Sequence, residues 1–305
     1  YDTQDSDRLI SSIIKELKLD KDLYKFKTIR NRISSLKNNL ITVNAYLNNS
    51  ELVQYDNESR RPLFGKIYQN YVERCFKSSA MDFDDLLLKT NELFNKFPEI
   101  LNKYQNRFKY IHVDEYQDTN HSQYLIVKGL ADKNENLCVV GDDAQSIYSF
   151  RGANIENILS FRKDYENASV YRLEQNYRST KNIVNAANSI INKNLNKLDK
   201  KVWTNNESGE KIHVNQLIND SEEGRFVASS IFENKNNFQL NNDSFAVLYR
   251  TNAQSRSIED ALRRKNIPYQ VYGGLSFYQR KEIKDVLAYL RVIVNPSDEE
   301  SIKRI

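Results

Sequence analysis

The first hundred residues of the chain repeat apolar side chains at the three- and four-residue spacing of amphipathic α-helices. One apolar stripe runs through residues 9–17, a second through residues 29–40 and a third through residues 67–76. Asp82 precedes a further stripe at residues 83–94 and is a suitable helix cap, because its carboxylate can accept hydrogen bonds from free backbone N–H groups. Such stripes are far more often core than ligand contacts, so the sequence predicts a helical, core-forming segment here.

From Phe108 onward the pattern changes to short apolar runs that alternate with helical stretches. The runs lie at residues 110–113, 137–140 and 170–173 and, after a helix from about residue 180 to 194, at residues 211–217, 245–249 and 269–272. This alternation is typical of a parallel sheet whose strands are connected by helices. The sequence therefore predicts an α/β protein with two successive α/β units.

Two of these runs lead directly into dense sets of acidic and amide side chains. The first reads YIHVDEYQDTN from Tyr110 to Asn120, and the second reads LCVVGDDAQSIYSFRGA from Leu137 to Ala153. Because loops at the carboxyl ends of parallel strands line one crevice, we expect both sets to meet along one edge of the sheet. The residues expected there are Asp114, Glu115, Gln117, Asp118, Asp142, Asp143 and Gln145.

Asp114 and Glu115 are adjacent carboxylates at the end of the first run, and they suit different tasks. An aspartate at this place can hold Mg²⁺ beside nucleotide phosphates, and a neighbouring glutamate can orient or deprotonate an attacking water. The alternative is a solvated acidic turn, which is the more common meaning of an isolated Asp-Glu pair. The surrounding motifs reverse that preference.

Three segments resemble sequence motifs of the UvrD/Rep/PcrA-like superfamily 1 DNA helicases, in that family's order and spacing. VDEYQDTN (113–120) resembles motif II, the Walker B box, VVGDDAQSIYSFRGA (139–153) resembles motif III, and LEQNYRST (173–180) resembles motif IV. FAVLYRTNAQSR (245–256) and YGGLSFYQRKEIKDVLAYLR (272–291) are similar to segments of the second motor domain. The resemblance covers most of the chain and is weakest in the first hundred residues.

The resemblance implies an α/β fold of RecA-like parallel-sheet motor domains, both partial, with an inserted N-terminal helical subdomain. The expected domains are the helical subdomain at residues 1–76, the C-terminal part of the first motor domain at 77–176, the N-terminal part of the second at 177–291, and the start of a further helical segment at 292–305. Motifs II and III then belong to the first motor domain, and motif IV belongs to the second.

The resemblance also implies roles for individual residues around ATP and Mg²⁺. Asp114 resembles the Mg²⁺ ligand, Glu115 the water-activating carboxylate, and Gln145 the motif III glutamine that senses the γ-phosphate. Arg178 resembles the motif IV arginine that reaches the γ-phosphate, and Tyr177 resembles the aromatic residue beside the adenine. An arginine supplied across a domain cleft neutralises charge on the transferred phosphoryl group when the cleft closes, which couples hydrolysis to domain movement.

Tyr148, Phe150 and Arg151 indicate single-stranded DNA as a partner. Two aromatic rings at i and i+2 on a loop can stack on unpaired bases with little dependence on base identity, and a nearby arginine can bind the backbone. The alternative is that both rings pack in a core. Arg250 and Asn252 resemble strand-contacting residues of the second motor domain, with a surface ion pair as the alternative for Arg250. The resemblance implies single-stranded DNA and 3′-tailed duplex DNA as partners.

The sequence contains no phosphate-binding loop of the form GxxxxGK[ST]. Its one Gly-Lys pair, Gly65-Lys66, is followed by Ile67 and has no glycine at the necessary distance upstream. No segment resembles motifs V and VI of the family. We therefore expect an internal piece of a larger helicase that by itself neither hydrolyses ATP nor unwinds DNA, with a natural homologue that has lost its motor activity as the alternative.

Composition and charge are compatible with this interpretation but do not decide it. The 305 residues are 39% hydrophobic and carry a formal net charge of +4, so the chain can build more than one core and has a mildly basic surface. Cys75 and Cys138 are expected to be buried, reduced thiols, and the three histidines have no partners at zinc-ligand spacing. No membrane-spanning run or signal peptide is visible, so a cytoplasmic location is expected.

Three functions remain open from the sequence. The first is part of an ATP-dependent helicase that moves on single-stranded DNA from 3′ to 5′, the direction that the resemblance implies. The second is the motor subunit of a helicase–nuclease complex, and the third is a degenerate, non-catalytic module that binds DNA or protein. The complete reading frame discriminates between them, since it shows whether GxxxxGK[ST] and a nuclease domain are present. The sequence identifies no protein partner.

Overall fold

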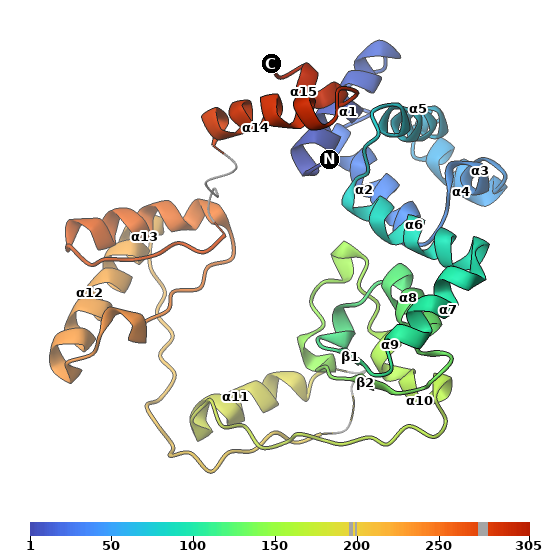
Figure 1. Ribbon diagram of the computed structural model, residues 1–305. Coiled ribbons are helices and arrows are strands. Elements are labelled where there is room, and N and C mark those ends of the chain that lie inside the picture. The colour runs from blue at the N-terminus through green and yellow to red at the C-terminus, as the bar shows by residue number, and fades with distance from the viewer. Residues whose placement is uncertain (195–197, 199, 274–279) are drawn as a thin grey trace. The chain divides into compact units, whose positions relative to one another are not determined.

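The computed structural model of the chain describes residues 1–194, 198, 200–273 and 280–305. Across these residues the protein is a predominantly helical α/β structure with one small parallel sheet, and it divides into two compact units (Figure 1). Unit 1 consists of Tyr1–Ser208 and Leu287–Ile305, and unit 2 consists of Gly209–Val286. The four domain ranges expected from the sequence were drawn from the positions of the motifs, whereas these two units are defined by their compactness. The four ranges therefore stay predictions.

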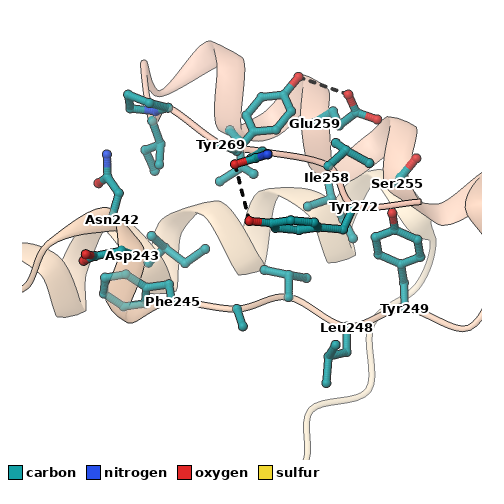
Figure 2. A pocket seen from close by; sticks show the side chains of 18 residues that line it. Asn242, Asp243, Phe245, Leu248, Tyr249, Ser255, Ile258, Glu259, Tyr269 and Tyr272 are labelled. Carbon is teal, nitrogen blue, oxygen red and sulfur yellow. Dashed lines mark hydrogen bonds between the residues drawn. The ribbon is translucent and has the colours of Figure 1, made fainter. Parts of the chain in front are cut away.

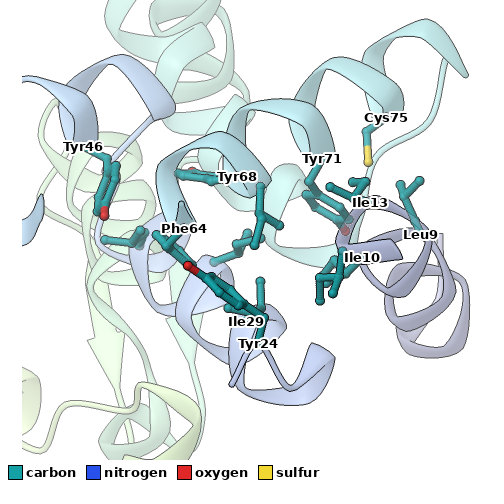
Figure 3. Close-up of a cluster of buried hydrophobic side chains, with 14 residues drawn as sticks. Leu9, Ile10, Ile13, Tyr24, Ile29, Tyr46, Phe64, Tyr68, Tyr71 and Cys75 are labelled. Atoms are coloured by element: carbon teal, nitrogen blue, oxygen red, sulfur yellow. The ribbon is translucent and has the colours of Figure 1, made fainter. Parts of the chain in front are cut away.

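Five helices at the start of unit 1 form the segment that the apolar stripes predicted. Their bounds are α1 Thr3–Glu16, α2 Phe26–Asn38, α3 Val43–Leu47, α4 Ser50–Glu58 and α5 Phe64–Lys77. Stripe residues of α1, α2 and α5 are buried in one apolar cluster together with the rings of Tyr46, Phe64 and Tyr68 (Figure 3). The helical prediction is confirmed, although Phe76, at the end of the third stripe, is 84% exposed because it lies off the buried face of α5.

A charged cluster joins α2 and α5 to α6 (Phe83–Lys96) in the interior of unit 1. Lys37 is fully buried, and its Nζ lies 2.7 Å from Asp82 Oδ2 and 2.7 Å from Asp85 Oδ1. The hydroxyl of Tyr71 donates a hydrogen bond to the same Asp82 oxygen at 2.8 Å. Burial alone would lower the pKa of Lys37, but the two carboxylates outweigh burial and raise this pKa, so the lysine stays charged. Asp82 also caps α6, as its sequence position predicted.

Two short parallel strands follow these helices, β1 at Ile111–Val113 and β2 at Leu137–Val139. Between them in the sequence runs α8 (His121–Ala131), against which α6 and α7 (Pro98–Arg107) pack. The register pairs the first residue of β1 with the first residue of β2. Both strands therefore end at the same edge of the sheet, which is where the two acidic segments begin.

The other helices that include residues of unit 1 are α9 Glu156–Leu159, α10 Phe161–Asp164, α11 Lys181–Ile191, α14 Lys281–Val294 and α15 Glu299–Ile302. The C-terminal residues return to the first helices, since Asn295 Nδ2 donates to the Ser78 carbonyl at 2.9 Å and Arg74 forms an ion pair with Glu299. No helix in the described ranges combines the length and the apolar character that crossing a membrane requires.

Unit 2 is built on two helices, α12 (Asp220–Phe238) and α13 (Asn252–Arg264), with a short 3₁₀ helix, η4 (Asn242–Ser244), between them in the sequence. The two helices approach closely at Gly224, where a Cβ would lie 2.5 Å from the carbonyl oxygen of Ser257. A small apolar core forms around this contact. Its buried residues are Ala228, Ile258, Ala261, Leu262 and Ile267.

Four of the predicted strands are wrong. Residues 170–173, 211–217, 245–249 and 269–272 form no strand and pair with no other strand among the described residues. Their apolar side chains include strongly exposed ones, with Leu173 87% and Leu248 95% exposed. A strand forms only where a second backbone completes its hydrogen bonds, and an apolar run does not show whether such a backbone is near. Of the predicted strands, the structure confirms β1 and β2.

The expected burial of the two cysteines is correct for one of them. Cys75 is buried in the helical cluster, but Cys138 on β2 is exposed. Successive side chains of a strand point to opposite faces of the sheet, so Cys138 lies on the face opposite to that of its neighbours Leu137 and Val139. In the described part of the chain that face is not covered.

Replacing Lys37 with methionine should strongly destabilise unit 1. The substitution leaves Asp82 and Asp85 buried without their counter-charge, and breaking a buried ion pair in this way costs about 3–5 kcal/mol. Urea unfolding of the 305-residue chain measures the loss.

The matched control is Lys96→Met, at a lysine of α6 whose side chain is 67% exposed. This change should cost less than about 1 kcal/mol, as is usual for exposed ion pairs. A Lys37→Met loss as small as that of the control would show that the buried cluster does not stabilise the fold.

Candidate functional site

The loop after β1 presents two carboxylates to solvent at the edge of the sheet. Asp114 and Glu115 are both exposed, and the backbone N–H of Glu115 donates to Asp114 Oδ1 at 2.9 Å. Glu115 has a φ of 50°, in the left-handed region that non-glycine residues seldom adopt and that is often found at functional sites. The 3₁₀ helix η1 (Tyr116–Asp118) follows directly, and its residues Tyr116 and Gln117 are buried.

The loop after β2 presents a second polar set. Asp142 Oδ1 accepts a hydrogen bond from the backbone N–H of Ala144 at 3.0 Å, which begins the 3₁₀ helix η2 (Asp143–Gln145). Gln145 Nε2 donates to Asp142 Oδ2 at 2.8 Å, so the glutamine is held by the carboxylate three residues before it. Asp143 is buried, whereas Gln145 is exposed.

Gln117 connects the two loops. Its Nε2 donates to Glu115 Oε2 at 2.8 Å, and its Oε1 accepts from the backbone N–H of Asp142 at 3.0 Å. The structure therefore brings Asp114, Glu115, Gln117, Asp142 and Gln145 together in one continuous hydrogen-bonded set. Asp118 lies near this set in the sequence, but its Oδ1 is buried with no hydrogen-bond partner among the described residues.

Gly141 has no side chain, and the side-chain amide of Gln117 lies in the space that a side chain at this position would need. A Cβ at this position would lie 2.5 Å from Gln117 Oε1 and 2.8 Å from Ile158 Cδ1. Contacts this short force one of the neighbours to move, so a side chain here would displace the amide that bridges the loops. The glycine is needed for the close approach of Gln117 rather than for a left-handed turn.

Lys200 belongs to the site and was not found by reasoning from the sequence. Its Nζ contacts Asp142 Oδ1 and Asp143 Oδ1, although it follows both by more than fifty residues. Burial alone would raise the pKa of Asp142, but hydrogen bonds from Lys200 and Gln145 outweigh burial and lower this pKa. No local pattern marks Lys200, because its contacts are with residues more than fifty positions earlier in the sequence.

Tyr177 and Arg178 lie on a separate exposed loop of unit 1. Asn176 Oδ1 accepts hydrogen bonds from the backbone N–H groups of Arg178 at 3.0 Å and Ser179 at 2.8 Å, and Tyr177 is 78% exposed. Among the described residues, no hydrogen bond or ion pair joins this loop directly to Asp114, Glu115 or Gln145. The convergence of Arg178 with the sheet edge around one triphosphate stays a prediction.

The aromatic loop after η2 carries the expected DNA-contacting rings. Tyr148 and Phe150 have ring centroids 6.0 Å apart with planes inclined at 42°, and Phe150 is 76% exposed. That exposure argues against the alternative in which both rings pack in a core. The backbone of Arg151 ends the 3₁₀ helix η3 (Ser149–Arg151), but its side chain lies outside the described residues.

Arg250 and Asn252 lie in unit 2, at the start of α13, and both are exposed. The backbone N–H groups of Arg250 and Thr251 both donate to Gln254 Oε1 at 3.0 Å, which fixes the entry into the helix. A cavity of about 740 Å³ lies beside this helix between the segments 245–249 and 269–272 (Figure 2). Aromatic side chains line it, among them Phe245, Tyr249, Tyr269 and Tyr272. Neither Arg250 nor Asn252 is among its lining residues.

The residues at the sheet edge fit a shared Mg²⁺ ion rather than a self-sufficient metal site. No group of three or more His, Cys, Asp or Glu side chains in the described ranges is arranged to hold a metal. In nucleotide sites one or two carboxylates share Mg²⁺ with phosphate oxygens and water, so such a group is not needed. Asp114 meets this requirement, because its carboxylate is exposed and, among the described residues, hydrogen bonds reach only its Oδ1, from the neighbouring N–H.

A parallel strand pair whose carboxyl ends carry linked acidic and amide side chains defines an α/β protein with a polar sheet edge. Comparison with known families identifies the family within this class. Residues 1–166 match the UvrD/REP helicase N-terminal domain, and residues 171–305 match the UvrD-like helicase C-terminal domain. The chain therefore belongs to the UvrD/REP helicase family, as the motifs in its sequence predicted.

Curated relatives support the same assignment. The chain is 47% identical over 306 residues to the ATP-dependent DNA helicase PcrA of Bacillus subtilis (strain 168), an alignment that covers 100% of this chain and 40% of that protein. It is 46% identical over 304 residues to the PcrA of Staphylococcus aureus (strain Mu50), covering 100% of this chain and 41% of the relative. The chain thus spans about two fifths of the length of these relatives.

Proposed function

We propose that this chain is part of an ATP-dependent DNA helicase, in which ATP hydrolysis drives 3′ to 5′ movement along single-stranded DNA and the unwinding of duplex DNA. The observation that carries the proposal is the hydrogen-bonded set from Glu115 through Gln117 to Asp142 and Gln145, in a chain of the UvrD/REP helicase family. The direction of movement rests on the resemblance of the motifs.

In this proposal the sheet edge carries out the chemistry on ATP. Asp114 holds Mg²⁺, which neutralises charge on the phosphates. Glu115 orients and deprotonates the attacking water, and the amide of Gln117 positions its carboxylate at 2.8 Å. Gln145 senses the γ-phosphate and passes its state to the loop after β2, to which it is bound through Asp142.

The exposed loop of Tyr177 and Arg178 completes the nucleotide site in this proposal. Arg178 stabilises negative charge on the transferred phosphoryl group, and Tyr177 stacks on the adenine. The hydrogen bonds that Asn176 accepts involve the backbone of this loop, so they leave the Arg178 guanidinium group available to a ligand. As the resemblance of the motifs implies, hydrolysis is then coupled to domain closure.

The DNA path runs over aromatic and basic side chains. Tyr148 and Phe150 stack on successive bases, and Arg151 binds the backbone beside them. Arg250 and Asn252 contact the strand from unit 2. Stacking of this kind is nearly indifferent to base identity, which suits a protein that must move along any sequence. Single-stranded DNA and 3′-tailed duplex DNA are the proposed substrates.

A second function, a non-catalytic DNA-binding module, is favoured by one observation. The 305 residues contain no GxxxxGK[ST] loop to hold the triphosphate. The two functions differ in what the protein encoded by the complete reading frame does, because a helicase must bring a phosphate-binding loop to Asp114 and Glu115. A binding module needs only the aromatic loop.

The 305-residue chain by itself should not hydrolyse ATP, because it lacks that loop. Phosphate release is measured with the purified chain in the presence of Mg²⁺ and single-stranded DNA. The product of the complete reading frame, assayed in parallel, should hydrolyse ATP. Turnover by the chain alone that disappears in Glu115→Gln would contradict the expectation.

In the product of the complete reading frame, Glu115→Gln should lower kcat by about 10²- to 10⁴-fold, the usual contribution of a general base. Nucleotide binding should change little, because the amide keeps the shape of the carboxylate and loses only its basicity. Steady-state kinetics and nucleotide titration measure the two effects. Glu99→Gln, at an exposed carboxylate of α7, is the control and should leave both unchanged. Retained turnover in Glu115→Gln would assign the base elsewhere.

Phe150→Ala should weaken binding of single-stranded DNA by about 5- to 150-fold, which corresponds to the loss of one stacked base at about 1–3 kcal/mol. Fluorescence anisotropy with a labelled oligonucleotide measures the affinity. Phe76→Ala removes a ring of α5 that is 84% exposed and should have no effect. An unchanged titration for Phe150→Ala would return that ring to a packing role.

A further inference from the structure

Gln117 is fully buried, although it lies only two residues beyond the exposed Glu115. A buried amide is tolerated when its donor and acceptor atoms are both engaged. Here the amide oxygen accepts from the backbone N–H of Asp142 at 3.0 Å, and the nitrogen donates to Glu115 Oε2 at 2.8 Å. Since a backbone N–H can only donate, Asp142 fixes the orientation of the amide and directs its NH₂ group at Glu115.

The surroundings leave this amide little freedom to move. The backbone N–H of Tyr116 donates to the Val140 carbonyl at 2.9 Å, which ties η1 to the end of β2. The Tyr116 ring is buried beside it, and the space next to Gln117 Oε1 is available only because residue 141 is glycine. The amide is therefore held against the loop after β2 on its oxygen side.

We infer that Gln117 is a positioning residue that couples the carboxylate of Glu115 to the loop carrying Asp142 and Gln145. This inference rests on the proposed function, because it assumes that Glu115 acts on water. The amide binds one oxygen of Glu115 and leaves the other, Oε1, to face the attacking water. Contact between Gln145 and the γ-phosphate then reaches Glu115 through Asp142 and Gln117, over two side-chain hydrogen bonds and one to the backbone.

The first experiment tests the coupling in the 305-residue chain without any catalytic readout. Hydrogen exchange at the Asp142 amide should become about three- to tenfold faster in Gln117→Leu, which removes the acceptor. It should stay slow in Gln117→Glu, which keeps an oxygen at that position.

Gln105→Leu is the matched control, since Gln105 is also a buried glutamine whose Nε2 donates to the Gly129 carbonyl at 2.8 Å. It removes a hydrogen bond of similar kind away from the sheet edge and should leave exchange at Asp142 unchanged. Equal exchange at Asp142 in Gln117→Leu and the wild type would overturn the coupling.

The second experiment tests the consequence for turnover in the product of the complete reading frame. Gln117→Leu and Gln117→Glu both remove the donor to Glu115, so both should lower kcat by about 10- to 100-fold while KM for ATP changes little. Gln105→Leu should keep the wild-type kcat, because Gln105 lies away from the sheet edge. A loss of kcat in the Gln117 variants alone therefore does not come from a general loss of stability. Unchanged kcat in both Gln117 variants would overturn the positioning role.

The two experiments separate failure of this inference from failure of the proposed function. If the wild-type product of the complete reading frame has no turnover, the proposed function fails, while hydrogen exchange still decides whether Gln117 couples the loops. If turnover is present but Asp142 exchange and kcat do not respond to Gln117, the inference fails and the proposed function stands. Should Gln117→Leu not fold, Gln117→Glu carries the kinetic test, because it retains the acceptor for Asp142.

Discussion

The buried amide of Gln117 is the interaction on which the acidic edge of the sheet depends. Asp114 and Glu115 lie on one side of it and Asp142 on the other, and loops with charges of like sign repel at short range. An amide that donates to one loop and accepts from the other holds them together without placing a positive charge between them. Lys200 then offsets the charge of the second loop by contacting Asp142.

The helical segment α1–α5 is connected to this edge through a second buried amide contact. Asn120 Nδ2 donates to Asn38 Oδ1 at 2.8 Å, next to Lys37 and its two carboxylates. Asn120 also caps α8 directly after the first acidic loop and forms an antiparallel bridge with Ala153 at the end of the aromatic loop. One residue thus contacts the helical segment, the end of the first acidic loop and the end of the aromatic loop within unit 1.

The sequence predictions that are confirmed depend on residues close together in the sequence, and those that are wrong depend on distant parts of the chain. Amphipathic stripes and the Asp82 cap depend on residues within one or two turns of helix, and they are confirmed. The runs at residues 170–173 and 245–249 have the same apolar character as β1 but no partner strand in the described ranges, so propensity alone misassigned them. The prediction that Cys138 is buried was wrong for a related reason, because no described part of the chain covers the face of β2 on which it lies.

The sequence by itself determined which chemical groups stand at the ends of the two strands, and with them the family to which the chain belongs. The tertiary structure decided how these groups contact one another. Gln117 meets Asp142 across 25 residues of sequence, and Lys200 meets Asp142 across 58. Such contacts depend on the register of β1 against β2 and on the position of Lys200 beside the loop after β2, neither of which is encoded in adjacent residues. Local periodicity therefore predicted the elements, whereas long-range hydrogen bonds assembled the site.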